Sequence, residues 1–236
     1  MPELKLRRIG HKGAGLIAPG NTAASFDAAL AAGVDMIEFD VLPEDHTRPA
    51  ESRLVLAHDY EHELDGALML EEGLAHLAGA PFSDTELDVD LKLPGYEARV
   101  LEALREFGLL ERALVSSTWM RSLVVLRELE PGLRLGWSVP RARRDYIASR
   151  LTKLPAYGAL GYLRTKLPRL AARHIAEGRC DAVMAHWALV SRRLVRSVRA
   201  AGGELYVWTV DDPRRIRRLE RLGVTGVITN DPRLFG

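Results

Sequence analysis

Two short apolar runs of the sequence carry carboxylates at alternate positions. Glu38 and Asp40 lie two residues apart in the first run, and Asp88 and Asp90 do so in the second. Strand residues two apart share a face, so each run would present its acids on one side and its apolar side chains on the other. Carboxylates that are enclosed together raise each other's pKa and need a cation beside them. All-oxygen ligation favours a hard divalent ion, Mg²⁺ or Ca²⁺, over zinc.

Two histidines stand at the ends of apolar runs. His11 follows the run at 6–10, and His58 follows an extended run at 53–57. Cleavage of a phosphate ester needs one group that takes a proton from the nucleophile and another that gives a proton to the leaving oxygen. Lys12 and Lys92 would supply positive charge to the phosphate. The histidines that we assign to the surface are His46, His62, His76 and His174.

The elements that must position these groups alternate along the chain. Short β-branched or apolar runs are followed by helical patterns, which is typical of parallel strands joined by helices. The predicted strands are 6–10, 36–41, 86–91, 113–117, 133–138, 181–185, 204–209 and 226–229. The predicted helices are 21–32, 96–107, 120–129, 145–177 in broken form, 191–201 and 212–222.

Eight such strands in 236 residues predict a closed (β/α)₈ TIM barrel, with residues 1–236 as a single domain. An open, doubly wound sheet is the alternative. The outer face of a barrel strand packs under helices and is apolar, which would turn Glu38, Asp40 and Asp90 inward near the rim where barrel enzymes place their active sites. The alternative for these acids is that they face outward and are solvated or paired with arginines.

The extended run at 53–57 is a ninth strand candidate. It follows the strand at 36–41 after only eleven residues, 42–52, which contain two prolines and no helical pattern. A parallel return needs a longer, usually helical crossover. We therefore expect a small β-hairpin insertion after strand 2, which would bring His58 back to the same rim.

The composition is that of a globular protein, with 47% hydrophobic and 28% charged residues. The net charge of +1 argues against a chain devoted to binding nucleic acid. No apolar run is long enough to span a membrane, and the first residues do not resemble a secretory signal, so we expect a cytoplasmic protein. The single cysteine, Cys180, cannot form an internal disulfide.

Residues 141–173 are strongly basic. They contain nine Lys or Arg and one acid, a local charge of +8, with leucines at helical spacing. Pro155 is expected to break this helical pattern and Pro168 to begin a further helix, so that 141–178 forms a basic helical elaboration. Either this elaboration is a barrel helix with a solvated basic face, or residues 141–173 make peripheral contact with an anionic membrane.

Seven short motifs follow one another along the chain. They are HKG at 11–13, PGNT at 19–22, IEFDV at 37–41, HD at 58–59, VDLK at 89–92, VWTVDD at 207–212 and GVITNDP at 226–232. In order and spacing they resemble the motifs of the glycerophosphodiester phosphodiesterase family, in which the first five usually read HRG, PENT, IELDV, HD and IEIK. The resemblance spans nearly the whole chain and is weakest at 140–180.

The resemblance implies a barrel enzyme that uses a divalent cation to hydrolyse glycerophosphodiesters to glycerol 3-phosphate and an alcohol. The nucleophile would be water or the glycerol 2-hydroxyl. Lysophospholipase D-like hydrolysis of lipid diesters and a non-catalytic barrel that binds phosphorylated ligands are the alternatives. The roles that the resemblance implies are metal binding by Glu38, Asp40 and Asp90, acid–base catalysis by His11 and His58, and substrate or phosphate binding by Lys12, Lys92 and Trp208.

Three positions depart from the family's usual motifs. Lys12 replaces Arg, which keeps the charge but loses the two-pronged contact with phosphate. Gly20 replaces Glu, and Asp90 replaces Glu with a side chain one methylene shorter. No required type of charge is lost, so we expect activity to survive and substrate preference to change.

Overall fold

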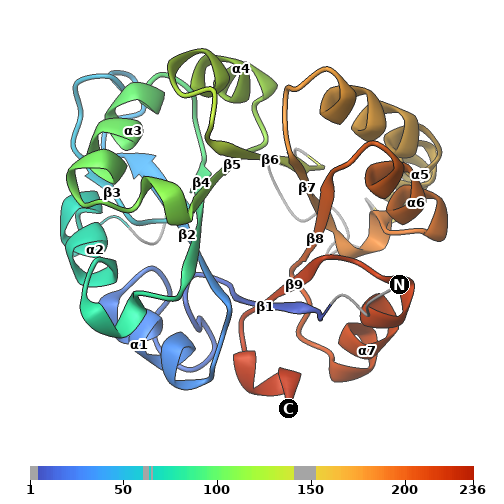
Figure 1. The fold of residues 1–236 in the computed structure, drawn as a ribbon, viewed down its shortest axis with the longest axis horizontal. Coiled ribbons are helices and arrows are strands. Elements are labelled where there is room, and N and C mark those ends of the chain that lie inside the picture. Colours follow the sequence, from blue (N-terminus) through green and yellow to red (C-terminus); the bar gives the residue numbers. More distant parts are fainter. Residues whose placement is uncertain (1–4, 61–63, 65, 141–152) are drawn as a thin grey trace.

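Eight parallel strands form a closed barrel with helices around its outside (Figure 1). The computed structural model of the chain describes residues 5–60, 64, 66–140 and 153–236. The barrel strands are β1 (Arg7–Gly10), β2 (Met36–Pro43), β4 (Glu86–Leu91), β5 (Ala113–Ser117), β6 (Arg134–Val139), β7 (Ala182–His186), β8 (Glu204–Trp208) and β9 (Gly226–Thr229).

The strands lie in chain order around the barrel, and β9 pairs with β1 to close it. All eight pairings between these strands are parallel. The predicted (β/α)₈ TIM barrel is therefore confirmed, and the open sheet is wrong. Each predicted strand is present with ends that differ by at most two residues, because the alternation of side chains that reveals a strand is a local property of the sequence.

The helices follow the strands on the outside of the barrel. They are α1 (Ala23–Ala31), α2 (Leu70–Leu77), α3 (Glu97–Glu106), α4 (Met120–Leu129), α5 (Lys153–Ala176), α6 (Arg192–Ala200) and α7 (Pro213–Leu222). Sequence analysis missed α2. Its signal is short: Leu70, Leu74 and Leu77 share one helical face and are buried, and the Glu72 carboxylate accepts a hydrogen bond from the Met69 amide at its start.

The insertion after β2 is a hairpin, as expected. β3 (Leu54–Val55) pairs antiparallel with the end of β2, where Leu42 lies opposite Val55. The observed strand is shorter than the expected run at 53–57. The chain leaves β3 toward the carboxyl ends of the barrel strands, and His58 follows within three residues.

Helix α5 differs from the broken pattern expected for it. The structure has one helix of 24 residues that runs through Pro168 without ending. Leu167 and Ala171, on either side of the proline, are buried against the outer faces of the neighbouring strands and helices. This packing holds the helix together across a residue that local propensity would place at a helix start. The part of the basic segment at 141–152 lies outside the described residues.

One histidine assigned to the surface is buried instead. His174, in the last turns of α5, packs edge-on against the Trp137 ring with centroids 4.9 Å apart. His76 pairs with Asp27 at the surface, at 2.8 Å. Among the described residues, no helix has both the length and the apolar character needed to cross a membrane.

The inside of the barrel is layered. At the amino ends of the strands, Glu86 accepts hydrogen bonds from Arg7 at 2.5 Å and from Arg134 at 2.6 Å. Arg134 also donates to Glu204 at 3.0 Å. These residues come from four alternate strands, the arrangement typical of layers inside such barrels. An apolar layer follows, made by Ile9, Met36, Leu114, Met184, Tyr206 and Ile228.

The charged layer is expected to stabilise the barrel in a pH-dependent way. Burial alone would raise the pKa of Glu86, but the hydrogen bonds and charges of Arg134 and Arg7 outweigh burial and lower the pKa. A carboxyl group with a lowered folded-state pKa contributes stability above its unfolded-state pKa and loses it as the pH falls through the folded-state value. We expect Glu86→Gln to reduce the free energy of unfolding by about 1–3 kcal/mol at neutral pH.

Urea denaturation at several pH values measures this effect. The difference from wild type should shrink as the pH falls below about 4, where the carboxylate becomes protonated. Glu51→Gln is the control, because Glu51 is exposed and reaches its partner Arg48 only at 4.0 Å. Equal losses of stability in both variants would show that the charged layer contributes nothing specific.

Candidate active site

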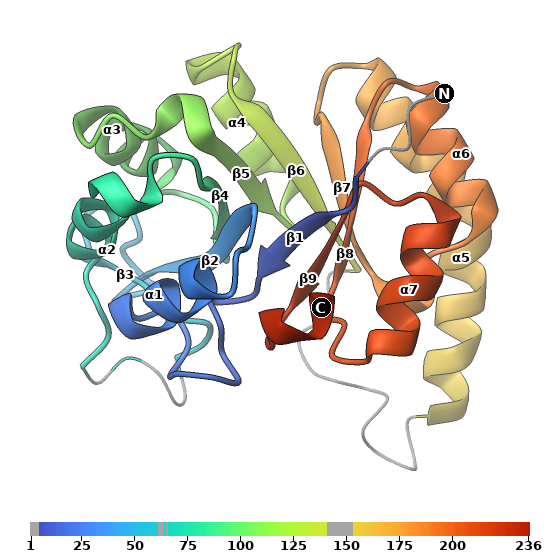
Figure 2. The ribbon, with the colours of Figure 1, turned by 60° about the horizontal axis from the view of Figure 1, so that its bottom comes forward.

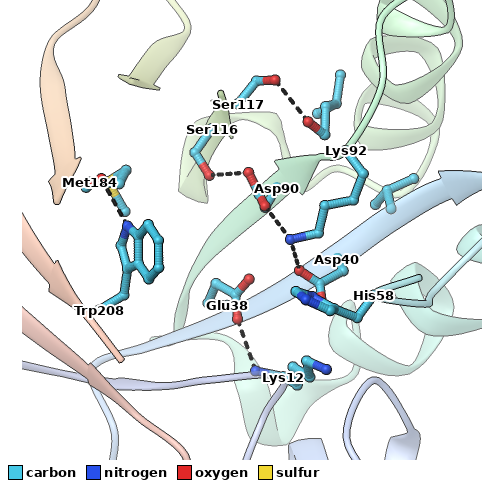
Figure 3. Close-up of polar contacts among 12 residues, drawn as sticks. Lys12, Glu38, Asp40, His58, Asp90, Lys92, Ser116, Ser117, Met184 and Trp208 are labelled. Atoms are coloured by element: carbon cyan, nitrogen blue, oxygen red, sulfur yellow. Dashed lines mark hydrogen bonds and ion pairs between the residues drawn. The ribbon is translucent and has the colours of Figure 1, made fainter. Parts of the chain in front are cut away.

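The acidic side chains of β2 and β4 meet inside the barrel near the carboxyl ends of these strands (Figure 3). The parallel register sets Asp40 beside Asp90. Glu38, Asp40 and Asp90 each offer a carboxylate oxygen, and these atoms lie within 4.8 Å of one another. Glu38 and Asp40 are buried, while Asp90 is partly accessible. The structure thus brings together the three carboxylates predicted to bind a metal, and it turns them inward.

Lys92 supplies a positive charge between two of these acids. Its ammonium group lies 2.5 Å from Asp40 Oδ1 and 2.5 Å from Asp90 Oδ2. Burial alone would lower the pKa of Lys92, but the charges of Asp40 and Asp90 raise it well above its usual value. The side chain predicted to contact phosphate therefore also offsets part of the negative charge of Asp40 and Asp90.

The neighbouring carboxylates have opposite pKa shifts. Burial and the charge of Asp40 raise the pKa of Glu38 well above its usual value. Asp40 is also buried, but the charge of Lys92 and the hydrogen bond from His58 hold its pKa well below the usual range. Burial raises the pKa of Asp88, one layer deeper, to about 8. Lys92 pairs with two of these four acids, so the group favours a further cation, and its all-oxygen donors fit a hard divalent ion.

The two candidate catalytic histidines lie against different members of the acid cluster. His11 Nε2 lies 3.8 Å from Glu38 Oε2, and His58 Nδ1 lies 3.0 Å from Asp40 Oδ2. The His58 side chain is 45% exposed, and that of His11 is 18% exposed. The two imidazoles thus flank the acid cluster, as sequence analysis predicted.

Asn230 defines the tautomer of His11. The Asn230 amide nitrogen donates to Asp211 Oδ2 at 2.7 Å, which turns the amide oxygen toward His11 Nδ1 at 2.6 Å. An amide oxygen can only accept, so Nδ1 carries the hydrogen and Nε2 keeps a lone pair that faces the acids. Burial, with the charges of Lys92 and Lys12, lowers the pKa of His11, although Asp40 and the Asn230 hydrogen bond oppose this shift. The neutral imidazole is therefore favoured.

Comparison with known proteins decides the family. Residues 11–67 and 85–234 match the Glycerophosphoryl diester phosphodiesterase family. The chain belongs to this family. A glycerophosphodiester phosphodiesterase from Caldanaerobacter subterraneus is 25% identical over 97% of this chain and 96% of its own length. The predicted family, and with it the predicted class of enzyme, a phosphoric diester hydrolase, are confirmed.

Solved structures of other glycerophosphodiester phosphodiesterases have the same fold. A putative glycerophosphoryl diester phosphodiesterase from Silicibacter pomeroyi superposes with a TM-score of 0.77 at 21% identity, covering 99% of this chain and 92% of that one. An Oleispira antarctica phosphodiesterase, solved in complex with the product sn-glycerol-3-phosphate, gives a TM-score of 0.67 at 20% identity, covering 96% and 94% of the two chains.

Two of the departures from the family's usual motifs are neighbours in space. Lys12 has a positive φ of 52°, and its backbone amide donates to Glu38 Oε2 at 2.9 Å. A Cβ atom added at Gly20 would lie 2.8 Å from the Lys12 Cβ. The glycine therefore makes room for the lysine stem. The third departure, Asp90, still reaches the acid cluster.

Trp208 and His186 form the opposite side of the site. The Trp208 indole donates to the Met184 carbonyl at 2.8 Å and lies across the barrel from the acids (Figure 3). His186, the last residue of β7, packs edge-on against Trp208 at 5.2 Å. Sequence analysis did not single out His186, although it directly follows the predicted strand at 181–185, as His11 and His58 follow their predicted strands.

Asn21 is a second residue that sequence reasoning missed. Its side-chain amide donates to Asp40 Oδ2 at 3.1 Å, and its amide oxygen accepts from the Asp40 backbone N–H at 3.1 Å. Asn21 is buried and has a φ of 59°, a conformation that asparagine tolerates better than most residues. The only sequence signal was its place in the PGNT motif.

Two substitutions of Asn21 separate the effect of its hydrogen bonds to Asp40 from the effect of its positive φ. Asn21→Gly removes the hydrogen bonds to Asp40 but permits the positive φ, whereas Asn21→Ala removes the bonds and strains the backbone. We expect the alanine variant to be less stable than the glycine variant by about 1 kcal/mol, the reverse of the usual order. Thermal and urea denaturation measure the difference. An alanine variant as stable as the glycine variant would contradict a strained backbone at this position.

Proposed function

We propose that this enzyme is a metal-dependent phosphodiesterase that hydrolyses glycerophosphodiesters to glycerol 3-phosphate and an alcohol by His/His acid–base catalysis. One observation carries the proposal: three clustered carboxylates have an imidazole on either flank at the rim of the barrel. The curated relative from Caldanaerobacter has this activity in its name, and the Oleispira phosphodiesterase was solved with sn-glycerol-3-phosphate as its product.

Glu38, Asp40 and Asp90 would hold Mg²⁺ or Ca²⁺. The bound cation would polarise a phosphoryl oxygen and lower the pKa of the nucleophile, whether that is water or the glycerol 2-hydroxyl. Asn21 and the Lys12 amide keep Asp40 and Glu38 oriented through the hydrogen bonds that they donate. Lys92 and Lys12 would bind the phosphate of the substrate, and Trp208 would form an apolar wall of the pocket.

His11 is suited to act as the general base. Its Nδ1 hydrogen is held by Asn230, which leaves the Nε2 lone pair to take a proton from the nucleophile. His58 would give a proton to the leaving alcohol oxygen, and its Nδ1 contact with Asp40 orients the ring for this transfer. The two rings approach the acid cluster from different elements and lie against different acids, so we assign one proton transfer to each.

The metal requirement can be tested with a soluble substrate. We expect glycerol 3-phosphate release from glycerophosphocholine to stop after treatment with EDTA and to return when Mg²⁺ or Ca²⁺ is added. Asp40→Asn and Asp90→Asn should each reduce kcat by about 10²-fold or more, because each substitution removes a negatively charged ligand of the cation. Calorimetric titration with each ion gives an independent readout of binding. Turnover that is unaffected by chelation would show that the metal assignment is wrong.

The histidine assignment has a matched control within the chain. His11→Ala and His58→Ala should each reduce kcat by about 10²-fold or more, because each removes a proton-transfer group. His76→Ala should leave kcat unchanged, because His76 contacts Asp27 on the outside of the barrel. Circular dichroism confirms that all three variants fold. Equal effects of the three substitutions would count against the proposed roles.

A lipid diester is a second candidate substrate. Leu16 and Ile17, in the loop that follows β1 and His11, are 64% and 39% exposed. They would offer an apolar contact to an acyl chain beside the site, as lysophospholipase D-like activity requires. Comparing kcat/KM for lysophosphatidylcholine and glycerophosphocholine tests this idea. Leu16→Ser should lower the first value only.

A further inference from the structure

The charge of the molecule is divided between its two halves. Helices α5, α6 and α7 contain fourteen Lys or Arg and one Glu, a sum of +13. The net charge of the whole chain is +1, so the remaining residues carry −12. These three helices stand next to one another on one side of the barrel (Figure 1). Sequence analysis predicted a basic surface from 141–173 alone. In the fold, the arginines of α6 and α7 extend the basic surface of α5.

Acidic partners do not neutralise this surface. Among the described side chains of the three helices, only Arg173 has an ion pair, with Glu177 at 2.7 Å. Where α5, α6 and α7 meet, a surface depression of about 480 Å³ is lined by Val190, Ser191, Leu222 and four arginines. The four are Arg164, Arg192, Arg218 and Arg221, and all are exposed. Repulsion among them is relieved when an anion binds.

Apolar side chains stand among the cations of α5. Tyr162 is 64% exposed, and Leu163 and Leu170 are also exposed. The Lys166 ammonium lies 5.8 Å from the centre of the Tyr162 ring. Helix α5 is longer than its neighbours, and its amino-terminal turns extend past the ends of α6 and α7 (Figure 2). Cations mixed with exposed Tyr and Leu are typical of surfaces that lie in the headgroup region of a bilayer.

We propose that the face formed by α5, α6 and α7 docks on an anionic phospholipid bilayer. The cations would contact lipid phosphates, while Tyr162, Leu163 and Leu170 would enter the boundary between headgroups and acyl chains. Nucleic acid would neutralise the arginines equally well but would leave these three apolar side chains without an apolar partner. Docking goes beyond the proposed function and does not depend on the assigned metal or histidines.

Co-sedimentation with vesicles tests the proposal. The chain of 236 residues is mixed with vesicles of phosphatidylcholine alone and with vesicles of phosphatidylcholine and phosphatidylglycerol in equal parts. We expect it to pellet with the second kind only, and to be released as salt is raised. Protein that stays in the supernatant with anionic vesicles at low salt would overturn the proposal, as would tighter binding to duplex DNA in a parallel titration.

Matched variants locate the surface. R192Q/R218Q should weaken vesicle binding about tenfold or more, since each cation near an anionic bilayer contributes about 1 kcal/mol. Y162S/L163S should weaken vesicle binding while leaving any binding to DNA unchanged. R48Q/R53Q removes the same charge from two exposed arginines on the β2–β3 hairpin and should bind like wild type. Equal loss in R192Q/R218Q and R48Q/R53Q would show that only net charge matters and would overturn the assigned face.

All variants are also assayed with glycerophosphocholine in solution, where each should keep wild-type kcat. This readout separates the two proposals. Failure to hydrolyse the substrate with normal vesicle binding would count against the proposed function alone. Normal hydrolysis without vesicle binding would remove the docking surface and leave the catalytic assignment intact.

Discussion

The site depends on carboxylates that the barrel holds together away from water. Glu38, Asp40, Asp88 and Asp90 share an enclosed space, and the ammonium group of Lys92 lies between Asp40 and Asp90. Their mutual repulsion and loss of hydration are visible in the raised pKa values of Glu38 and Asp88. A cluster of this kind stays folded only when protons or cations balance its charge, and its three clustered carboxylates could bind a divalent cation.

The rest of the fold holds this unfavourable arrangement in place. Hydrophobic burial on the outer faces of β2 and β4 fixes the strands, and the parallel register then sets Asp40 beside Asp90. The buried Tyr96 hydroxyl donates to the Val41 carbonyl at 2.6 Å, which ties the end of β2 to the segment after β4. The carboxylates cannot move apart without breaking these contacts, so their geometry is present before any ligand binds.

Local patterns predicted much of this, and long-range contacts account for what they missed. The alternation of acidic and apolar residues within single strands was enough to predict that Glu38, Asp40 and Asp90 face inward. Asn21 was missed because its role depends on a positive φ and on Asp40, nineteen residues away. The Arg7–Glu86 pair joins residues 79 apart, and helix α5 continues through Pro168 because of packing that its own sequence does not contain. Contacts of this kind exist only once the barrel closes.

The layers inside the barrel also limit how a substrate can enter the site and how products can leave it. Below the acids, Ile9, Met36 and Tyr206 fill the centre with no exposed surface, and Arg134 and Glu86 pair at the level beneath them. Among the described residues, these side chains occupy the barrel interior on the amino-terminal side of the acids. A diester and both of its hydrolysis products would therefore pass through the carboxyl-terminal opening of the barrel, and the alcohol would have to leave this opening before the next diester enters.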